Sequence, residues 1–217
     1  MSTTMHPTVA GEASSLAPNS AIAGARVNIR VSTAAEASHS GIWVGIFAIT
    51  MSFVAFTSAL FVREGASNDW VHLTLPSILY WNTLALIASS ITLEASRRAI
   101  FTGREFRSGT ERAGSGWLVF TLALGLLFVA GQLAAWGQLG DQGLYLATNP
   151  NSSFFYVLTG AHALHVLGGI LAMAWLVRLR LGSRTTMRRR TFESVAIYWH
   201  FMGVLWIYLL IVLRSKL

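Results

Sequence analysis

Residues 154–169 read FFYVLTGAHALHVLGG, and this stretch belongs to a longer apolar run, Phe154–Val177. The run is close in length to the roughly 20 residues with which an α-helix crosses a bilayer. Four more runs have similar lengths: Ile42–Val62, Leu75–Leu93, Trp117–Leu139 and Val195–Leu213. Soluble helices of such length carry a polar stripe, which these runs largely lack. The sequence therefore predicts an all-α fold, a polytopic membrane protein built as a bundle of five transmembrane helices.

Basic residues are distributed unevenly over the segments that join these runs. The N-terminal tail and the second and fourth connecting segments hold most of them: Arg26, Arg30, Arg97, Arg98, Arg104, Arg107, Arg112, Arg178, Arg180, Arg184, Arg188, Arg189 and Arg190. The other side holds Arg63, Arg214 and Lys216. Cytoplasmic segments are enriched in Arg and Lys, so this asymmetry predicts a cytoplasmic N-terminus and a periplasmic C-terminus. The net charge of +7 then reflects topology and attraction to anionic lipid rather than binding of nucleic acid.

Composition sets two further limits. The chain has no cysteine, which excludes disulfides, thiolate copper or iron–sulfur sites and Cys-attached haem. Residues 1–40 are rich in Ala, Ser and Thr and have few large apolar side chains, so we expect a disordered cytoplasmic tail. Residues 41–217 are expected to form the five-helix transmembrane domain.

Three histidines fall inside the apolar runs, where an imidazole costs free energy unless it has a partner. His162 and His165 share one helix face, about 12 and 17 Å from the outer end at ~1.5 Å per residue. By the same arithmetic His200 lies about 22 Å from the outer surface. This difference in depth argues against a haem between His165 and His200. The open alternatives are a lipid head group, a hydrogen bond between helices and a metal.

Other polar residues in the runs favour structural roles. Asn82, Thr83, Ser89 and Ser90 can bond to backbone carbonyls or across helices, and Gln132 is expected to join helices. Glu94 precedes Arg97 and Arg98 at the spacing of helical ion pairs. No carboxylate lies in the middle of any run, and no phosphate-binding loop, HExxH or nucleophile elbow occurs. The sequence supports no catalytic site on this chain.

Several of these motifs match one family. The chain resembles subunit III of the haem–copper oxidases, the cytochrome c and quinol oxidases, in the short bacterial form with five spans. FFYVLTGAHALHVLGG is similar to the family's FF-x-LTG-x-H-x-x-HV-x-x-G, and Glu193 with YWHF at 198–201 and Trp206 is similar to E-x(4)-YWHF-x-D-x-x-W. Asn82-Thr83-Leu84 and Ser89-Ser90 resemble its NTL…SS. The resemblance covers about residues 41–213.

The chain departs from the family pattern at three places. Ile49, Ala135 and Gly203 stand where the family usually has Glu, Glu and Asp. These departures leave the fold unaffected, but they bear on any part that such acids play in proton supply or lipid binding, and on the oxidase subtype.

The resemblance implies a non-catalytic accessory membrane subunit of a terminal haem–copper oxidase in the bacterial cytoplasmic (inner) membrane. Such a subunit packs on catalytic subunit I, binds phospholipid and supports proton uptake and active-site stability during oxygen reduction. It holds no haem or copper itself, because these belong to partner subunits. The resemblance implies subunits I and II as partners, and membership of a larger respiratory supercomplex is a further possibility. The expected lipid-binding or helix-interface residues are His162, His165, His200, Trp199, Tyr198, Glu193, Arg178 and Arg180.

Two other hypotheses stay open at this stage. The first is an accessory subunit of nitric oxide reductase, for which the membrane physics is identical. The second is a free-standing b-type cytochrome or small transporter, which the unequal histidine depths and the missing mid-span acids disfavour.

Overall fold

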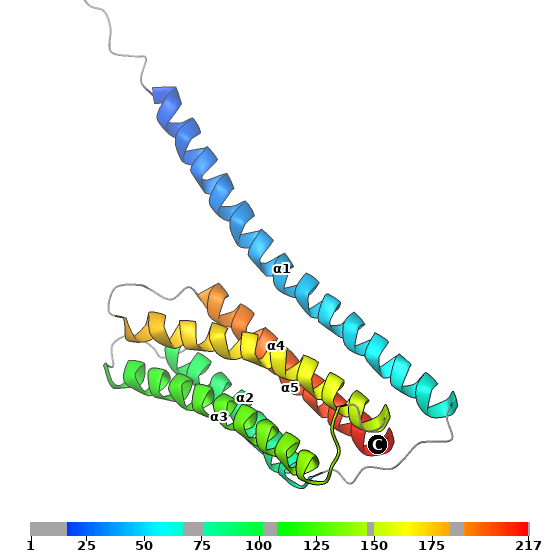
Figure 1. Ribbon diagram of the computed structural model, residues 1–217. Coiled ribbons are helices and arrows are strands. Elements are labelled where there is room, and N and C mark those ends of the chain that lie inside the picture. The colour runs from blue at the N-terminus through cyan, green and yellow to red at the C-terminus, as the bar shows by residue number, and fades with distance from the viewer. Residues whose placement is uncertain (1–16, 67–75, 102–107, 147–149, 183–188, 217) are drawn as a thin grey trace, which may run out of the picture. The chain divides into compact units, whose positions relative to one another are not determined.

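The computed structural model describes residues 17–66, 76–101, 108–146, 150–182 and 189–216, and in residues 17–40 and 108–113 it describes the backbone alone. These residues form five α-helices (Figure 1), which are α1 (Ala17–Ala66), α2 (Ile78–Phe101), α3 (Ser108–Asp141), α4 (Pro150–Leu181) and α5 (Arg189–Lys216). Within the described part of the chain, each helix contains a segment long and apolar enough to cross a membrane. The predicted all-α class with five membrane-spanning helices is thereby confirmed.

Helix α1 begins well before the predicted first span. It starts at Ala17, so residues 17–40 are helical where the sequence predicted a disordered tail, and residues 1–16 of that tail lie outside the described residues. Alanine has the highest helix propensity, and a segment that continues an existing helix avoids the cost of nucleation. The chain divides at Gly41 into two compact units, Met1–Gly41 and Ile42–Leu217, and the second holds all the spans described below.

The end of α3 shows why one connecting segment turns where it does. Gly143 has a φ of +74°, a left-handed conformation that glycine adopts at little cost. The Gly143 amide donates to the Gly140 carbonyl at 2.9 Å, and the Leu144 amide donates to the Leu139 carbonyl at 3.1 Å. This pair of bonds is a Schellman motif, which satisfies carbonyls that the helix end would leave unpaired.

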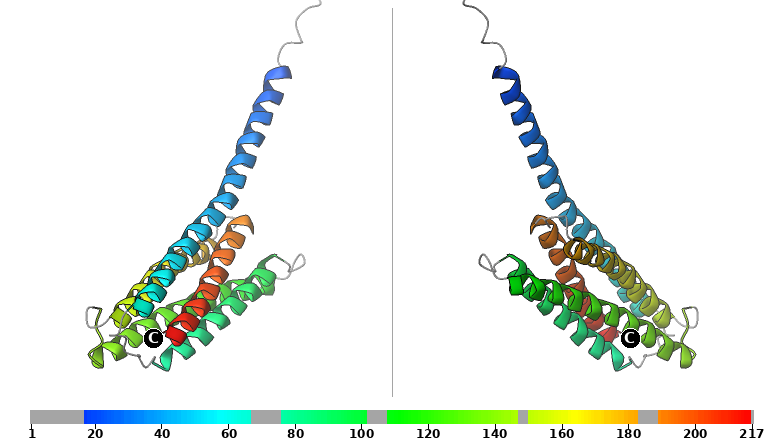
Figure 2. Two further views of the ribbon diagram at one scale, coloured as in Figure 1. Left: turned by 90° about the vertical axis from the view of Figure 1, so that its right-hand side faces the viewer. Right: turned by 90° about the vertical axis from the view of Figure 1, so that its left-hand side faces the viewer.

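Helices α2 to α5 form a closed ring (Figures 1 and 2). Helix α2 packs against α3, α3 against α4, α4 against α5, and α5 against α2. The largest buried side chains of this ring include Trp199 and Trp206 of α5, Phe128 of α3 and Phe155 of α4. The motif YWHF therefore lies on the helix that closes the ring.

The membrane-spanning part of α1 contacts the ring through side chains. Phe53 lies edge-on to the ring of His165, with 5.9 Å between centroids. Near the other end of the span, the Lys216 ammonium lies 2.9 Å from Glu64 and 4.7 Å from the centroid of the Phe61 ring. Most of the other face of α1 is apolar and exposed, including Val44 at 67% and Phe47 at 62%.

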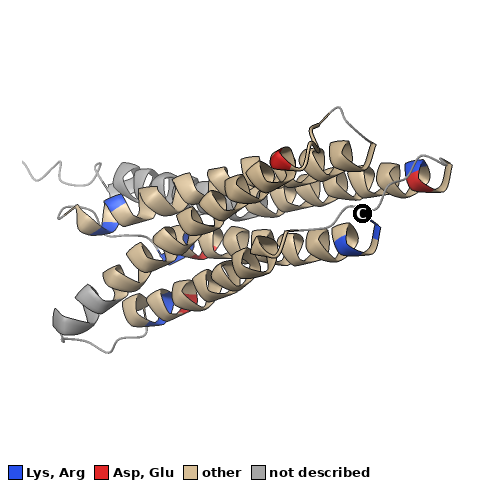
Figure 3. Ribbon diagram, turned by 60° about the horizontal axis from the view of Figure 1, so that its bottom comes forward, with Lys and Arg blue, Asp and Glu red and all other residues tan. Residues whose placement is uncertain are grey.

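Charged residues lie toward the ends of the helices, with long uncharged stretches between them (Figure 3). Water and lipid head groups can solvate charges at the ends of a span, whereas the hydrocarbon core cannot. The charge distribution thus agrees with the spans defined by length and hydropathy.

Candidate functional site

His162 lies at the contact of four helices. Its side chain on α4 is 1% exposed, and its ring lies 5.1 Å from Trp206 of α5, 6.1 Å from Phe128 of α3 and 6.4 Å from Phe53 of α1, centroid to centroid. Neither ring nitrogen has a hydrogen-bond partner among the residues the structure describes. The structure therefore places His162 at a helix interface inside an aromatic cage.

His165 and Tyr198 connect the two histidine-containing motifs. The His165 ring, one turn along α4, has its Nδ1 2.7 Å from the carbonyl of Ala161. The backbone carbonyl of His165 accepts a hydrogen bond of 2.9 Å from the Tyr198 hydroxyl on α5. A side-chain carbon at Gly169 would lie 3.2 Å from the Tyr198 ring, so the absence of a side chain there lets the two helices approach closely.

Trp199 occupies the centre of the ring of helices and is 1% exposed. Its indole lies between two glycines, because a Cβ at Gly125 of α3 would be 2.8 Å from Cη2 and a Cβ at Gly169 of α4 would be 3.1 Å from Cε3. Its Nε1–H donates to the Ser89 hydroxyl of α2 at 3.0 Å. One side chain thus contacts all three other helices of the ring.

Hydroxyl groups along α2 form a series of bonds to neighbouring helices. Besides Ser89, Thr83 accepts from the Trp206 indole at 3.0 Å, and the Thr92 and Thr121 hydroxyls lie 2.8 Å apart. Ser96 donates to the backbone carbonyl of Gly114 at 2.8 Å. The sequence left open bonds to backbone carbonyls and bonds across helices, and Thr83 and Ser89 make both: each donates to a carbonyl of α2 and accepts from an indole of α5. The bonds across helices join them within an apolar medium.

Two buried amides on facing helices differ from these hydroxyls. Asn82 packs directly onto Gly131 of α3, so closely that a Cβ there would collide with the amide. Within the described structure, Asn82 Nδ2 and both polar atoms of the Gln132 amide lack hydrogen-bond partners. A bond from Gln132 to another helix, which the sequence suggested, is therefore not among the contacts of the described residues.

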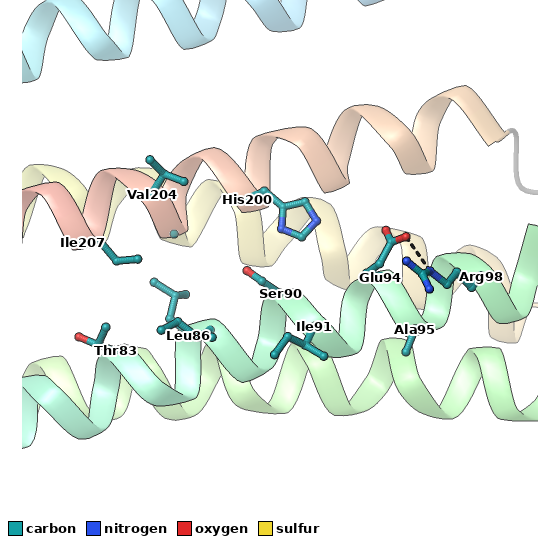
Figure 4. Close-up of a pocket in the computed structure, with 12 residues that line it drawn as sticks. Thr83, Leu86, Ser90, Ile91, Glu94, Ala95, Arg98, His200, Val204 and Ile207 are labelled. Carbon is teal, nitrogen blue, oxygen red and sulfur yellow. Dashed lines mark hydrogen bonds and ion pairs between the residues drawn. The ribbon is translucent and has the colours of Figure 1, made fainter.

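His200 lies apart from the other two histidines. It lines a groove between α2 and α5 of about 610 Å³, whose lining includes neither His162 nor His165. Figure 4 shows its ring between the two helices, on the side of Ser90 and Glu94. The rest of the lining is mostly apolar and includes Leu86, Ile87, Ile91, Val204 and Ile207, with Thr83 at the end away from Arg98 (Figure 4).

A cationic cluster closes one end of this groove. The Glu94 carboxylate receives two hydrogen bonds from Arg97, at 2.7 and 2.8 Å, and one from Arg98 Nε at 3.0 Å. Arg98 lines the groove, and its side chain is 76% exposed, whereas that of Arg97 is 39% exposed. Two guanidinium groups and one carboxylate leave a net charge of about +1 at this end.

The remaining predicted residues lie at helix ends. Glu193 pairs with Arg189 one turn away on α5, at 2.8 Å. Arg178 is exposed and Arg180 is half-buried near the end of α4, where the Arg178 carbonyl accepts a bond of 3.0 Å from the amide of Gly182. The predicted residues are thus divided among a buried contact region, a groove and the helix ends, instead of forming one site.

The three positions that depart from the family pattern have different surroundings. Ala135 is fully buried in the hydrophobic core. Ile49 is half-buried and packs against that core. Gly203 lines the groove between α2 and α5, where an added Cβ would meet the Ser90 hydroxyl at 3.6 Å. The apolar residues that stand in place of the family's acids therefore fit the packing at Ala135 and Ile49, whereas Gly203 leaves space in the groove.

The described residues define a helical membrane bundle held by tryptophan, glycine and hydroxyl contacts. In the part of the chain that the structure describes, no three His, Asp or Glu side chains come together where they could hold a metal ion.

Comparison with known proteins identifies the family. The family described as cytochrome c oxidase subunit III matches residues 35–215, which include four of the five spans entirely and all but the last residue of the fifth. The chain belongs to this family, in agreement with the resemblance carried by its motifs, and is an accessory subunit of an oxidase.

Curated relatives agree with this assignment. A probable cytochrome c oxidase subunit 3 of Mycobacterium tuberculosis (strain ATCC 25618 / H37Rv) is 37% identical over 179 residues, covering 78% of this chain and 85% of the relative. A protein of the same description from Nocardia farcinica is 34% identical over 174 residues, covering 76% of each. Cytochrome c oxidase subunit 3 of Synechocystis is 32% identical over 177 residues, covering 80% of this chain and 69% of the relative.

Proposed function

We propose that this chain is a non-catalytic subunit of a terminal haem–copper oxidase that packs on catalytic subunit I in a bacterial cytoplasmic membrane. The family match, which reaches all five spans, is the observation that carries the proposal. The haem and copper of the enzyme belong to partner subunits, and subunit II is a further partner. The N-terminus faces the cytoplasm, as the distribution of arginine indicates.

Within that complex the chain supports proton uptake and active-site stability through packing and bound phospholipid. Exposed apolar side chains on several spans supply surface for both partner helices and acyl chains, including Trp81, Leu164 and Leu171, each about 70% exposed. Arginines at the helix ends, such as Arg178, can hold phosphate oxygens through charge-assisted hydrogen bonds.

The test is purification of the tagged chain from its native membranes in mild detergent, with a reduced-minus-oxidised spectrum and mass spectrometry of the eluate. We expect a haem-containing complex that includes an oxidase subunit I and consumes oxygen. A chain that elutes alone and colourless would contradict the proposal. A coloured complex with nitric oxide reductase activity and no oxidase activity would assign the chain to the other branch.

A further inference from the structure

Trp199 and the three residues around its indole form one layer of the ring of helices, and these residues are Ser89 of α2, Gly125 of α3 and Gly169 of α4. A second layer lies seven residues farther along each helix, which is about two helical turns toward the connection between α3 and α4. We refer to it as the polar layer, and it consists of Asn82 of α2, Gln132 of α3, His162 of α4 and Trp206 of α5. Each helix of the ring thus contributes one nitrogen-containing side chain to the same level.

Contacts between helices show that the members of the polar layer lie at one level. The His162 ring of α4 lies 5.1 Å from the Trp206 ring of α5, centroid to centroid. The Trp206 indole N–H donates at 3.0 Å to the hydroxyl of Thr83, which follows Asn82 on α2. The Asn82 amide in turn packs onto the residue before Gln132 on α3. The contacts therefore run around the ring from α4 to α5, α2 and α3.

The two amides of the polar layer are buried beside each other and have polar atoms without partners. Asn82 is 5% exposed and Gln132 is 1% exposed. Consecutive Cα atoms are about 3.8 Å apart, so the packing of Asn82 onto Gly131 places its amide next to the backbone of Gln132. Among the described residues, Asn82 Nδ2, Gln132 Nε2 and Gln132 Oε1 nevertheless have no hydrogen-bond partner. The two amides therefore do not bond directly to each other.

The other members of the polar layer do not supply the missing partners. The Trp206 N–H already donates to Thr83, and the His162 ring is surrounded by aromatic rings. No carboxylate belongs to the layer, so a cation would have no counter-charge there. Water both donates and accepts, and buried water typically bonds to polar groups that would otherwise lack a partner. The next buried residue along α3, Ala135, has a short side chain, which supports space for water on this face of the helix.

We propose that ordered water is bound between Asn82 and Gln132 in the polar layer. The water accepts from the N–H groups of the two amides and donates to Gln132 Oε1. It thereby makes the connection between α2 and α3 that the direct contacts of Gln132 do not make. This inference goes beyond the proposed function and does not depend on it, because both amides belong to this chain.

The test is radiolytic footprinting of the tagged chain, purified with its partners from native membranes, and water itself is the probe. An X-ray pulse forms hydroxyl radicals from water, including water bound inside a protein, and the radicals add oxygen to aromatic side chains next to it. We expect oxygen on Trp206 and Phe128, which contact each other beside the amides and are both 0% exposed. Trp199 is equally buried, but its indole N–H is bonded to Ser89, and it should stay unlabelled.

Substitutions separate water held by the amides from general penetration of solvent. Gln132→Met keeps the length of the side chain but removes the amide, so labelling of Trp206 and Phe128 should fall to the level of Trp199. Gln138→Met makes the same change at an exposed position of α3 and should leave the labelling unchanged. His162→Leu keeps both amides of the polar layer and should also retain the label.

Three outcomes would overturn the proposal: Trp206 labelled no more than Trp199, label that survives Gln132→Met, or label that is lost in His162→Leu. If Gln132→Met lowers the yield of the complex, a cryo-EM map of the unaltered complex that resolves ordered water decides instead. Density within about 3 Å of both Asn82 Nδ2 and Gln132 Oε1 would support the proposal, and ordered water elsewhere with none between these amides would contradict it. Failure of the chain to purify with any haem-containing subunit would contradict the proposed function but leave the footprinting readout intact.

Discussion

The position of Trp199 leads to a prediction about Gly125, the glycine that faces it on α3. A Cβ at Gly125 would lie 2.8 Å from Cη2 and 3.0 Å from Cζ2 of the indole. The indole has little freedom to withdraw, because Gly169 lies on its other side and its N–H is held by Ser89. Gly125→Ala should therefore force the helices apart or strain the tryptophan.

The magnitude follows from two opposing terms. Overpacking of a well-packed core costs about 1–3 kcal/mol. Replacing glycine by alanine in a helix contributes about 0.5–1 kcal/mol in the other direction. Gly137 of the same helix has no atom within 4 Å of an added Cβ, so Gly137→Ala carries the second term alone. The difference in stability between the two variants should thus be about 1–3 kcal/mol.

The assay is thermal unfolding of the purified complex in mild detergent, followed by loss of this subunit and by circular dichroism. We expect Gly137→Ala to be as stable as the unaltered protein or slightly more stable, and Gly125→Ala to lose the subunit at a lower temperature. Equal stability of the two variants would refute the placement of Trp199 between two glycines. Restoration of stability by Trp199→Phe in the Gly125→Ala background would support it, because the smaller ring leaves room for the methyl group.

Three further substitutions test other contacts in the same unfolding assay. Ser89→Ala leaves the buried indole N–H of Trp199 without its acceptor and should lower the free energy of unfolding by about 1–3 kcal/mol. The control is Ser52→Ala, which removes an exposed hydroxyl bonded to its own helix and should change stability by less than about 0.5 kcal/mol. Equal effects of the two substitutions would contradict the interhelical bond. His162→Leu removes two ring nitrogens that have no hydrogen-bond partner among the described residues, and it should leave stability unchanged or raise it by up to about 1–3 kcal/mol. A clear loss of stability would show that the imidazole has a partner outside the described residues. Glu64→Gln breaks a partly exposed ion pair with Lys216 and should cost no more than about 1 kcal/mol; a larger loss would show that the pair is shielded from water in the complex.

The spans were predictable because their signal is local. An apolar window of membrane length needs no knowledge of what lies beside it. Four of the five predicted runs lie entirely on helices of the structure, and α2 holds the fifth from Ile78 onward, since Leu75 lies outside the described residues and the helix begins three residues after it. The helix ends were less predictable, because polar residues continue a helix beyond the hydrocarbon. Helix α3 begins at Ser108 and α4 ends at Leu181, whereas the apolar runs begin at Trp117 and end at Val177.

One contact between the two histidine-containing motifs shows the limit of such local signals. The Tyr198 hydroxyl of α5 donates to the backbone carbonyl of His165 on α4 at 2.9 Å. The contact joins residues 33 positions apart, so no local pattern could have predicted it.

The groove and the central tryptophan were beyond prediction from the sequence for a related reason. A glycine in an apolar run is compatible with a helix crossing, a lipid contact or an open surface, and only the arrangement of the neighbouring helices distinguishes them. Gly125 and Gly169 both face Trp199, whereas Gly203 lines a groove. The chemistry of the three residues is identical, and their roles differ through what lies opposite.

These contacts explain how an almost entirely apolar bundle can specify one arrangement of its helices. In lipid, burial of apolar surface gives little preference for one helix neighbour over another, because the acyl chains are equally apolar. The two indole N–H groups of α5 need acceptors, and Ser89 and Thr83 of α2 provide them. The glycines that receive Trp199 lie on α3 and α4, so correct placement of this one side chain fixes α5 relative to all three other helices of the ring. The histidines of FFYVLTGAHALHVLGG belong to the same arrangement, since the ring of His162 and the carbonyl of His165 contact side chains of α5.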